Sequence, residues 1–171
     1  MTRTLILLRH AKSDWRAGAS DDHERPLNAR GQRAAAVVGV YLNQEGLAPD
    51  LVLTSTAARA RETGDWVLQH AGFTVTPRAE RSLYLADPGR ILGVLRQAGG
   101  EHRRILLIGH NPGLQDLVEM LAEHAGKPAG PAIGEGFPTA SLAICECATP
   151  WDVVKAETLA LTGVVVPKTL V

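Results

Sequence analysis

Two short, fully apolar runs dominate the hydrophobic pattern of the chain. Residues 5–8 read Leu-Ile-Leu-Leu, and residues 105–108 read Ile-Leu-Leu-Ile. Runs of this kind are typical of strands that are buried on both faces, as in a parallel sheet. Residues 51–53 predict a further short strand, and residues 73–75 predict a brief extended segment. The pattern therefore indicates a sheet that is covered on both sides.

Helical periodicity fills the segments between these runs. Residues 28–43 carry apolar side chains along one helical face, and residues 60–71 carry a second such stripe. Asp87 followed by Pro88 predicts the cap and the first residue of a third helix. Asn111 followed by Pro112 predicts the same two positions of a fourth helix.

The C-terminal part of the chain has a different character. Glycine and proline dominate residues 125–138, which predicts a loop, with a lid over the site as one role open to it. Residues 141–146 and 152–159 resemble two strands around a turn at Pro150 and Trp151, which predicts an antiparallel hairpin. The whole alternation predicts one α/β domain over residues 1–171. Its expected architecture is a three-layer α/β/α sandwich on a mostly parallel sheet, with the hairpin at the C-terminal end.

Composition and charge narrow the expected partners. The 171 residues are 45% hydrophobic, and 18 lysines and arginines balance 18 aspartates and glutamates. This balance leaves no net positive charge that would attract nucleic acid or an anionic membrane, so neither is expected as a partner. The sequence shows no signal peptide and no apolar stretch of about 20 residues, which predicts a cytoplasmic protein. Cys145 and Cys147 share one face of a predicted strand and are expected to stay reduced.

Candidate chemistry lies at the ends of the two apolar runs. The first run ends in Arg9-His10, and the second ends in Gly109-His110. Ligands of open α/β sheets bind at the carboxyl ends of the strands, so the two histidines are expected at one site. A neutral imidazole can act as a nucleophile, and a guanidinium group matches the oxygens of a phosphate. The alternatives are a hydrogen-bonded surface histidine beside a salt-bridged arginine at the first run, and a helix-capping role for His110.

A further cation lies where the strand at residues 51–53 runs into a helix. Arg59 falls near the first turn of this helix, where free N–H groups and the helix dipole attract anions. Arg59 is therefore a candidate ligand of the same anion. The alternative is that Arg59 and Arg61 are solvated helix residues paired with Glu62 or Asp65. This alternative fits Arg61 better, because Arg59 lies closer to the strand edge that carries the histidines.

Three segments together resemble a known family. They are Arg9-His10-Ala11, the segment 55–63 with Ser55, Arg59, Ala60 and Thr63, and Gly109-His110-Asn111-Pro112. In this order they resemble the signature segments of the histidine phosphatase superfamily, which has the phosphoglycerate mutase-like fold. Residues 9–13 (Arg-His-Ala-Lys-Ser) and residues 25–27 (Arg-Pro-Leu) are most similar to its small phosphohistidine phosphatase branch, the SixA type.

The resemblance implies a role for each candidate residue. His10 is implied as the nucleophile that becomes phosphorylated. Arg9 and Arg59 are implied as ligands of the phosphoryl oxygens, and His110 as the second histidine that stabilises the transition state. Arg25 is implied as a further phosphate ligand at the mouth of the pocket. Neither a metal nor a cofactor is expected, because histidines surrounded by arginines favour an anion.

A general acid for the leaving group is harder to assign from the sequence. Glu80 is a candidate by its approximate position, and a loop carboxylate paired with Arg78 or Arg81 is the alternative reading of this residue. Other carboxylates near the site are those of Asp14, Asp21 and Asp22. Without a well-placed acid, a substrate with a good leaving group, such as phosphohistidine, is favoured over an alkyl phosphate.

The predicted function is hydrolysis of a phosphoryl group through a phosphohistidine intermediate on His10. A phosphorylated protein that carries phosphohistidine is the favoured substrate, because a short chain without a large inserted cap leaves the site open. A small phosphate ester, such as a sugar phosphate or a nucleotide, is the alternative substrate. A phosphate-binding module without catalysis is the remaining alternative.

Overall fold

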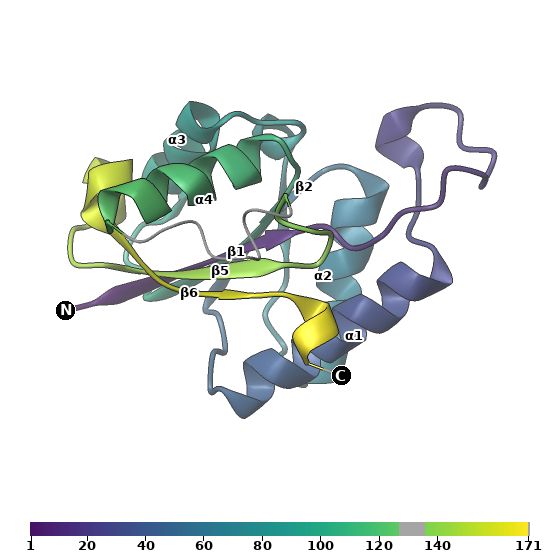
Figure 1. The fold of residues 1–171 in the computed structure, drawn as a ribbon, viewed down its shortest axis with the longest axis horizontal. Helices are drawn as coiled ribbons and strands as arrows, with labels where there is room; N and C mark the ends of the chain where they lie inside the picture. The colour runs from purple at the N-terminus through teal and green to yellow at the C-terminus, as the bar shows by residue number, and fades with distance from the viewer. Residues whose placement is uncertain (127–135, 171) are drawn as a thin grey trace.

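The computed structural model describes residues 1–126 and 136–170, and within them six strands form one mixed sheet (Figure 1). The strands follow the order β3-β2-β4-β1-β5-β6 across the sheet. The parallel part consists of β1 (Arg3–Arg9), β2 (Leu51–Ser55), β3 (Arg78–Glu80) and β4 (Arg104–Gly109). β5 (Leu142–Cys147) runs antiparallel to β1, and β6 (Leu159–Val165) runs antiparallel to β5.

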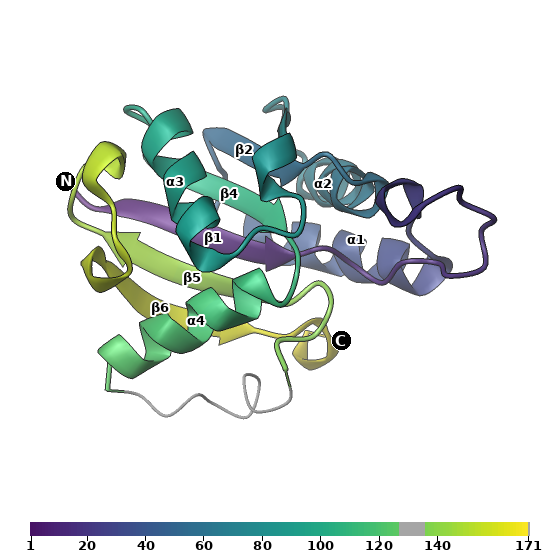
Figure 2. The ribbon, with the colours of Figure 1, turned by 90° about the horizontal axis from the view of Figure 1, so that it is seen from above.

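Helices cover both faces of this sheet (Figure 2). α1 (Ala29–Gln44) and α2 (Ala58–Ala71) lie on one face, whereas α3 (Pro88–Ala98) and α4 (Gly113–His124) lie on the other. Alternate residues of β1 serve the two cores. Leu5 and Leu7 pack with α3 and α4, and Ile6 and Leu8 pack with α1 and α2. The predicted three-layer α/β/α sandwich is therefore confirmed.

Two helices begin after a residue whose side chain caps them, and the cap of the second, Asp87, was predicted. The side-chain oxygen of Asn28, directly before α1, accepts from the N–H of Gly31 at 2.9 Å. The side-chain oxygen of Asp87, directly before α3, accepts from the N–H of Arg90 at 2.8 Å. In both helices the cap satisfies an N–H group of the first turn that has no partner inside the helix.

The start of α4 differs from the prediction. Asn111 does not cap this helix, which begins at Gly113 without a side-chain cap. The Nδ2 group of Asn111 instead donates to the carbonyl oxygens of Gly136 and Phe137, both at 3.2 Å. The prediction was wrong because the Asn111 side chain holds the segment that leads into β5 against the start of α4.

The predicted positions of two strand segments are also wrong. Residues 152–159 contain two 3-10 helices, η3 (Trp151–Val153) and η4 (Ala156–Thr158), and β6 begins only at Leu159. Trp151 is fully buried, and its Nε1 donates to the carbonyl oxygen of His102 at 2.7 Å, which draws this connection away from a tight hairpin. The extended segment expected at residues 73–75 is displaced as well, because the strand in this part of the chain, β3, begins only at Arg78.

Three further expectations concern the loop, the membrane and the cysteines. Residues 127–135 of the predicted loop, and with them any lid, lie outside the described residues. Among the helices of the described segments, none is long and apolar enough to cross a membrane. Cys145 and Cys147 are buried free thiols, as expected.

Gly31 and Gly93 provide a matched test of how closely the loop after β1 approaches α1. A Cβ at Gly31 would lie 2.1 Å from the carbonyl oxygen of Lys12, whereas a Cβ at Gly93 in α3 would meet nothing nearer than 3.9 Å. Gly31→Ala is therefore expected to lower the free energy of unfolding by about 1–3 kcal/mol. Gly93→Ala is expected to raise it by about 0.5–1 kcal/mol through helix propensity. Urea unfolding checks both values, and equal effects at the two sites would contradict the close approach.

Candidate active site

The C-terminal ends of β1 and β4 bring two histidines together. Arg9 pairs with Gly109 in the parallel register, and the N–H of His10 donates to the carbonyl oxygen of Gly109 at 3.0 Å. The imidazole rings of His10 and His110 lie with their centroids 5.2 Å apart. Both side chains are buried and line a pocket of about 410 Å³. Backbone pairing between two central strands thus fixes the spacing of the histidines.

His10 is held as a neutral ring with its unprotonated nitrogen beside Arg59. Its Nδ1 lies 2.7 Å from the carbonyl oxygen of Ala11, which can only accept, so Nδ1 carries the proton. Its Nε2 lies 3.3 Å from the Nε–H of Arg59, which can only donate, so Nε2 keeps its lone pair. Burial lowers the pKa of His10 to about 4, and the positive charges of Arg59, Arg9 and Arg25 act in the same direction. The ring is therefore neutral at pH 7.

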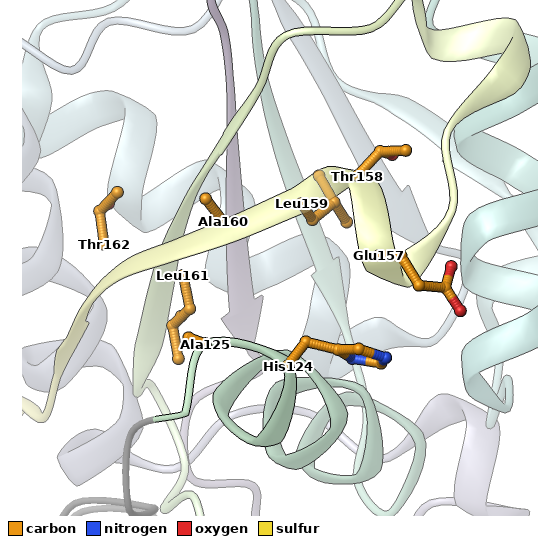
Figure 3. Close-up of a pocket in the computed structure, with 8 residues that line it drawn as sticks. All are labelled: His124, Ala125, Glu157, Thr158, Leu159, Ala160, Leu161 and Thr162. Atoms are coloured by element: carbon orange, nitrogen blue, oxygen red, sulfur yellow. The ribbon is translucent and has the colours of Figure 1, made fainter.

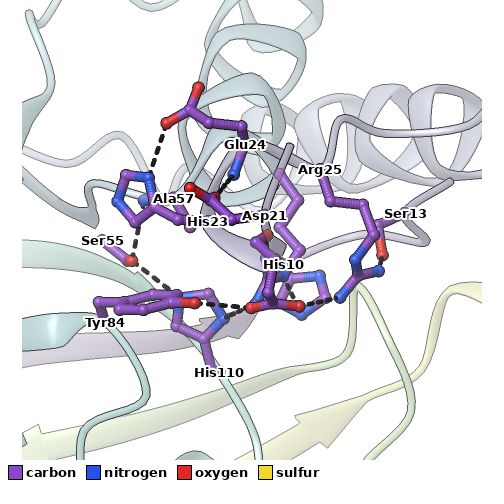
Figure 4. Close-up of polar contacts among 12 residues, drawn as sticks. His10, Ser13, Asp21, His23, Glu24, Arg25, Ser55, Ala57, Tyr84 and His110 are labelled. Atoms are coloured by element: carbon purple, nitrogen blue, oxygen red, sulfur yellow. Dashed lines mark hydrogen bonds and ion pairs between the residues drawn. The ribbon is translucent and has the colours of Figure 1, made fainter. Parts of the chain in front are cut away.

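His110 is also neutral and is oriented by Ser55 (Figure 4). Its Nε2 lies 2.7 Å from the Oγ of Ser55, and its Nδ1 lies 3.3 Å from Nη2 of Arg59. The guanidinium group can only donate, so Nδ1 accepts and Nε2 carries the proton. Burial lowers the pKa of His110 to about 3, with His10 and Arg59 as further causes. The Oγ of Ser55 is itself fixed by the N–H of Ala57 at 3.2 Å.

Arg59 links the two histidines from the first turn of α2. The residue is only 2% exposed, and its guanidinium group has several partners. Beyond the contacts with His10 and His110, Nη1 donates to the carbonyl oxygen of Asp22 at 2.7 Å. The hydroxyl of Thr63 donates to the backbone oxygen of Arg59 at 2.6 Å and accepts from the N–H of Ala11 at 2.9 Å. Thr63 thereby connects the start of α2 to the segment that carries His10.

The carboxylate of Asp22, in the 3-10 helix η1 (Asp22–Glu24), lies among the cationic groups. Its Oδ1 is 2.9 Å from Nη2 of Arg25, and its Oδ2 is 3.0 Å from Nη2 of Arg59 and 2.7 Å from the hydroxyl of Tyr84. The hydrogen bond from Tyr84 and the two guanidinium groups hold the pKa of Asp22 far below its ordinary range. Asp22 is therefore ionised, and its two oxygens lie where phosphate oxygens fit between two arginines.

Arg9, Arg25 and Lys12 complete the positive lining of the pocket. Arg25 is 8% exposed, and its guanidinium carbon lies over the Trp15 ring, 3.5 Å from the ring centroid. With Arg59, these residues place four cationic side chains around a pocket whose lining contains one carboxylate, that of Asp22. The arrangement therefore suits a multiply charged anion.

The other carboxylates considered as acids lie outside this pocket. Oε1 of Glu80 is 2.5 Å from Nε of Arg78, and Glu80 does not line the pocket. Asp14 and Asp21 accept from backbone N–H groups of their own loop. Of the four acids named from the sequence, Asp22 alone faces the histidines, and it is ionised.

A second hollow, of about 590 Å³, lies between the end of α4 and β6 (Figure 3). His124, Ala125 and residues 157–162 line it, and none of the candidate site residues reaches it. Within residues 1–126 and 136–170, no three histidine, cysteine or acidic side chains gather in a way that could hold a metal ion. The groups suited to chemistry thus converge at the ends of the central strands.

Comparison with known proteins identifies the family. The model of the histidine phosphatase superfamily (branch 1) matches residues 5–111, which include both histidines and Arg59. The chain belongs to the histidine phosphatase superfamily. The uncharacterized protein Rv1276c of Mycobacterium tuberculosis is 38% identical over 94% of this chain and 100% of its own length.

Two solved structures of candidate phosphohistidine phosphatases named SixA are similar to this histidine phosphatase. The protein from Nakamurella multipartitia is 28% identical and superposes with a TM-score of 0.80. The superposition covers 98% of this chain and 97% of that chain. The protein from Agrobacterium tumefaciens is 27% identical and superposes with a TM-score of 0.80. The superposition covers 96% of this chain and 98% of that chain. The recognised family and the phosphoglycerate mutase-like fold are therefore confirmed.

Two residues of this histidine phosphatase site had no assigned role in the sequence analysis. Ser55 carried a signal, its place four residues before Arg59 in the matched segment. Tyr84 carried none, because it follows the 3-10 helix η2 (Arg81–Leu83) and meets Asp22 only through folding. Its ring also lies edge-on to that of His110, with the centroids 5.5 Å apart.

The neutral, buried state of His10 predicts a specific loss of stability in acid. Its pKa of about 4 in the folded protein lies below its ordinary value of 6.5, so the unfolded chain binds a proton that the folded protein excludes as the pH falls between these values. From pH 6.5 to pH 4, the native protein should lose about 3 kcal/mol more unfolding free energy than His10→Asn. Urea unfolding across this pH range measures the difference, and parallel curves would contradict a neutral His10.

Asp22 competes with any anion that uses Arg25 and Arg59. Asp22→Asn is therefore expected to tighten the binding of inorganic phosphate by roughly tenfold at pH 7. The reason is that no carboxylate then occupies the positions on Arg25 and Arg59 that the phosphate oxygens need. Asp14→Asn makes the same charge change in the same loop outside the pocket and serves as the control. Isothermal titration calorimetry measures both affinities. Weaker binding by Asp22→Asn would show instead that Asp22 orients the arginines for the ligand.

Proposed function

We propose that this protein is a phosphatase that transfers a phosphoryl group to His10 and then to water, without a metal ion, and that its substrate is a protein phosphohistidine. One observation carries the proposal: the unprotonated Nε2 of a neutral, buried histidine lies in a pocket lined by four cations. A neutral imidazole nitrogen is a competent nucleophile toward phosphorus. The surrounding guanidinium groups supply the charge that a phosphoryl group in transfer requires.

The first step is attack by His10 after the substrate anion displaces the carboxylate of Asp22. The Nε2 lone pair forms an N–P bond while the bond from phosphorus to the leaving nitrogen breaks. The substrate imidazole, protonated on its other ring nitrogen, takes that electron pair and leaves as a neutral ring. The phosphorylated ring of His10 becomes positively charged, and the hydrogen bond from Nδ1–H to the Ala11 oxygen stabilises this charge. Arg9, Arg25 and Arg59 hold the phosphoryl oxygens through the transfer.

His110 can serve as a donor to the phosphoryl group through a change of tautomer. The Ser55 hydroxyl accepts from the N–H of Ala57, which leaves its own proton free to turn toward Nε2 of His110. In that arrangement Nδ1 of His110 carries the proton and points it at a phosphoryl oxygen in place of accepting from Arg59. In the second step, water attacks phosphorus and the N–P electron pair returns to His10, which is again neutral with its proton on Nδ1. Inorganic phosphate leaves with both protons of the water, as the dihydrogen phosphate anion.

The state of the carboxylates supports phosphohistidine over an alkyl phosphate. Asp22 is held ionised, and Glu80 pairs with Arg78 away from the pocket, so within the described chain no protonated carboxyl lines the site. An alkoxide leaving group needs such an acid, whereas an imidazole whose other nitrogen already carries a proton leaves as a neutral ring without one. The two SixA structures described above support the same substrate class.

The substrate assignment is tested by a panel of phosphorylated peptides of one sequence, carrying phosphohistidine, phosphoserine or phosphotyrosine. Phosphohistidine is expected to give the highest kcat/KM, and His10→Ala is expected to abolish turnover of all three. Arg59→Ala should lower kcat by about 10²–10³-fold through the loss of an oxyanion partner. Phosphate release measured by a colorimetric assay gives each rate.

Glu80→Gln tests whether Glu80 acts as a general acid in the reaction. Turnover of the phosphohistidine peptide by this variant should stay close to that of the native protein, because the carboxyl does not face the pocket. A fall of about 10²-fold or more would show that Glu80 acts as a general acid and would favour an ester substrate. Phosphate binding without turnover of any panel member would leave the protein a phosphate-binding module.

A further inference from the structure

A groove of about 470 Å³ adjoins the catalytic pocket. Lys12 and Thr139 line both hollows, so the groove begins where the pocket that holds the histidines ends on this side. Its walls come from the N-terminal half of α1 and from the C-terminal 3-10 helix η5 (Pro167–Thr169), which contacts α1 (Figure 1). The groove is thus formed by elements other than those that carry the catalytic candidates.

The lining of this groove combines positive rims with an apolar floor. Lys12, Arg30, Arg33 and Lys168 supply four cations, and no acidic side chain is among the lining residues. Apolar side chains, including that of Val37, lie between them. The side chains of Lys12, Arg30 and Arg33 are exposed and form no ion pair or hydrogen bond with the described residues. Their charges are therefore available to a ligand from outside the chain.

We propose that this groove binds an acidic segment of polypeptide that adjoins the phosphorylated residue of the substrate protein. The inference rests on the proposed function, because it places the phosphoryl group at His10 and the flanking chain along Lys12 and α1. Because the two hollows adjoin at Lys12 and Thr139, a chain attached to the phosphoryl group can reach the groove. A polypeptide with acidic and aliphatic side chains complements both the cationic rims and the apolar floor.

The lining favours a polypeptide over other anions. Single-stranded nucleic acid is held by aromatic side chains that stack on its bases, and no aromatic residue lines the groove. A small anion such as free phosphate leaves the apolar floor around Val37 uncovered. An acidic segment uses both kinds of surface, and its binding weakens with salt because the rim charges are exposed to solvent.

The experiment compares two phosphohistidine peptides, one flanked by glutamates and one flanked by glutamines. The native protein should show a kcat/KM about tenfold higher for the acidic peptide at low salt, mainly through KM, and added salt should reduce this preference. Arg30→Glu combined with Arg33→Glu should abolish the preference, because it reverses two charges of the rim. All variants should hydrolyse p-nitrophenyl phosphate at the native rate, which also shows that they are folded.

Arg103→Glu combined with Lys155→Glu is the matched control. Both residues are exposed, and they lie near the starts of β4 and β6, at the opposite end of the sheet from the histidines. This variant makes the same change in net charge and should keep the full preference for the acidic peptide. An equal loss in both double variants would assign the effect to overall charge and overturn the groove proposal.

A binding measurement separates this inference from the proposed function. Fluorescence polarisation with the labelled acidic peptide, carrying unphosphorylated histidine, should show binding by the native protein that Arg30→Glu/Arg33→Glu loses. This result would support the groove even if neither phosphohistidine peptide were hydrolysed, in which case the proposed function alone fails. Two results would overturn the proposal. One is equal binding of the glutamate-flanked and glutamine-flanked peptides by the native protein, and the other is tighter binding of an oligonucleotide of the same charge.

Discussion

The burial of Arg59 between two histidines is the constraint on which the rest of the site depends. The guanidinium group of an arginine that is 2% exposed must have partners for its donors, because an unpaired buried charge costs several kcal/mol. It obtains them from the bare ring nitrogens of His10 and His110 and from Asp22. Burial lowers the pKa of each imidazole and keeps it neutral, and Arg59 adds to this effect. The contacts with Arg59 also decide which nitrogen of each ring keeps its lone pair. The charge that gives affinity for phosphate thus helps to set the tautomer of the proposed nucleophile.

Asp22 completes this balance in the protein without ligand. Its carboxylate stabilises the two guanidinium groups that a substrate would otherwise neutralise, and Tyr84 holds it in place. The parallel pairing of β1 and β4 positions the histidines rigidly, whereas η1 and the residue directly after it carry Asp22 and Arg25. Rigid strand ends thus hold the proposed nucleophile, and a short segment between β1 and α1 carries the group that we propose exchanges with the substrate.

The sequence predicts the central strands and the histidines at their ends, because these depend on local patterns. It does not predict the contacts at the periphery, because these join segments that are distant in the chain. Runs such as Leu5–Leu8 are apolar on both faces, so they predict buried strands, and residues at the ends of such strands must meet at one edge. Asp87 predicts the start of a helix because a cap is a local contact. The Asn111 side chain, the connection around Trp151 and the meeting of Tyr84 with Asp22 depend on segments distant in the chain. Local patterns carry no information about such contacts, so those features required the structure.

The central claim is that the bare nitrogen of His10 accepts the phosphoryl group, and a single-turnover labelling experiment tests it most directly. The protein is mixed in excess with a radiolabelled phosphohistidine peptide, quenched in alkali at successive times and analysed by mass spectrometry. The account predicts that the label passes transiently through the protein as one phosphoryl group on His10, before inorganic phosphate appears. Label on any other residue, or phosphate release at every time point without labelled protein, would contradict it.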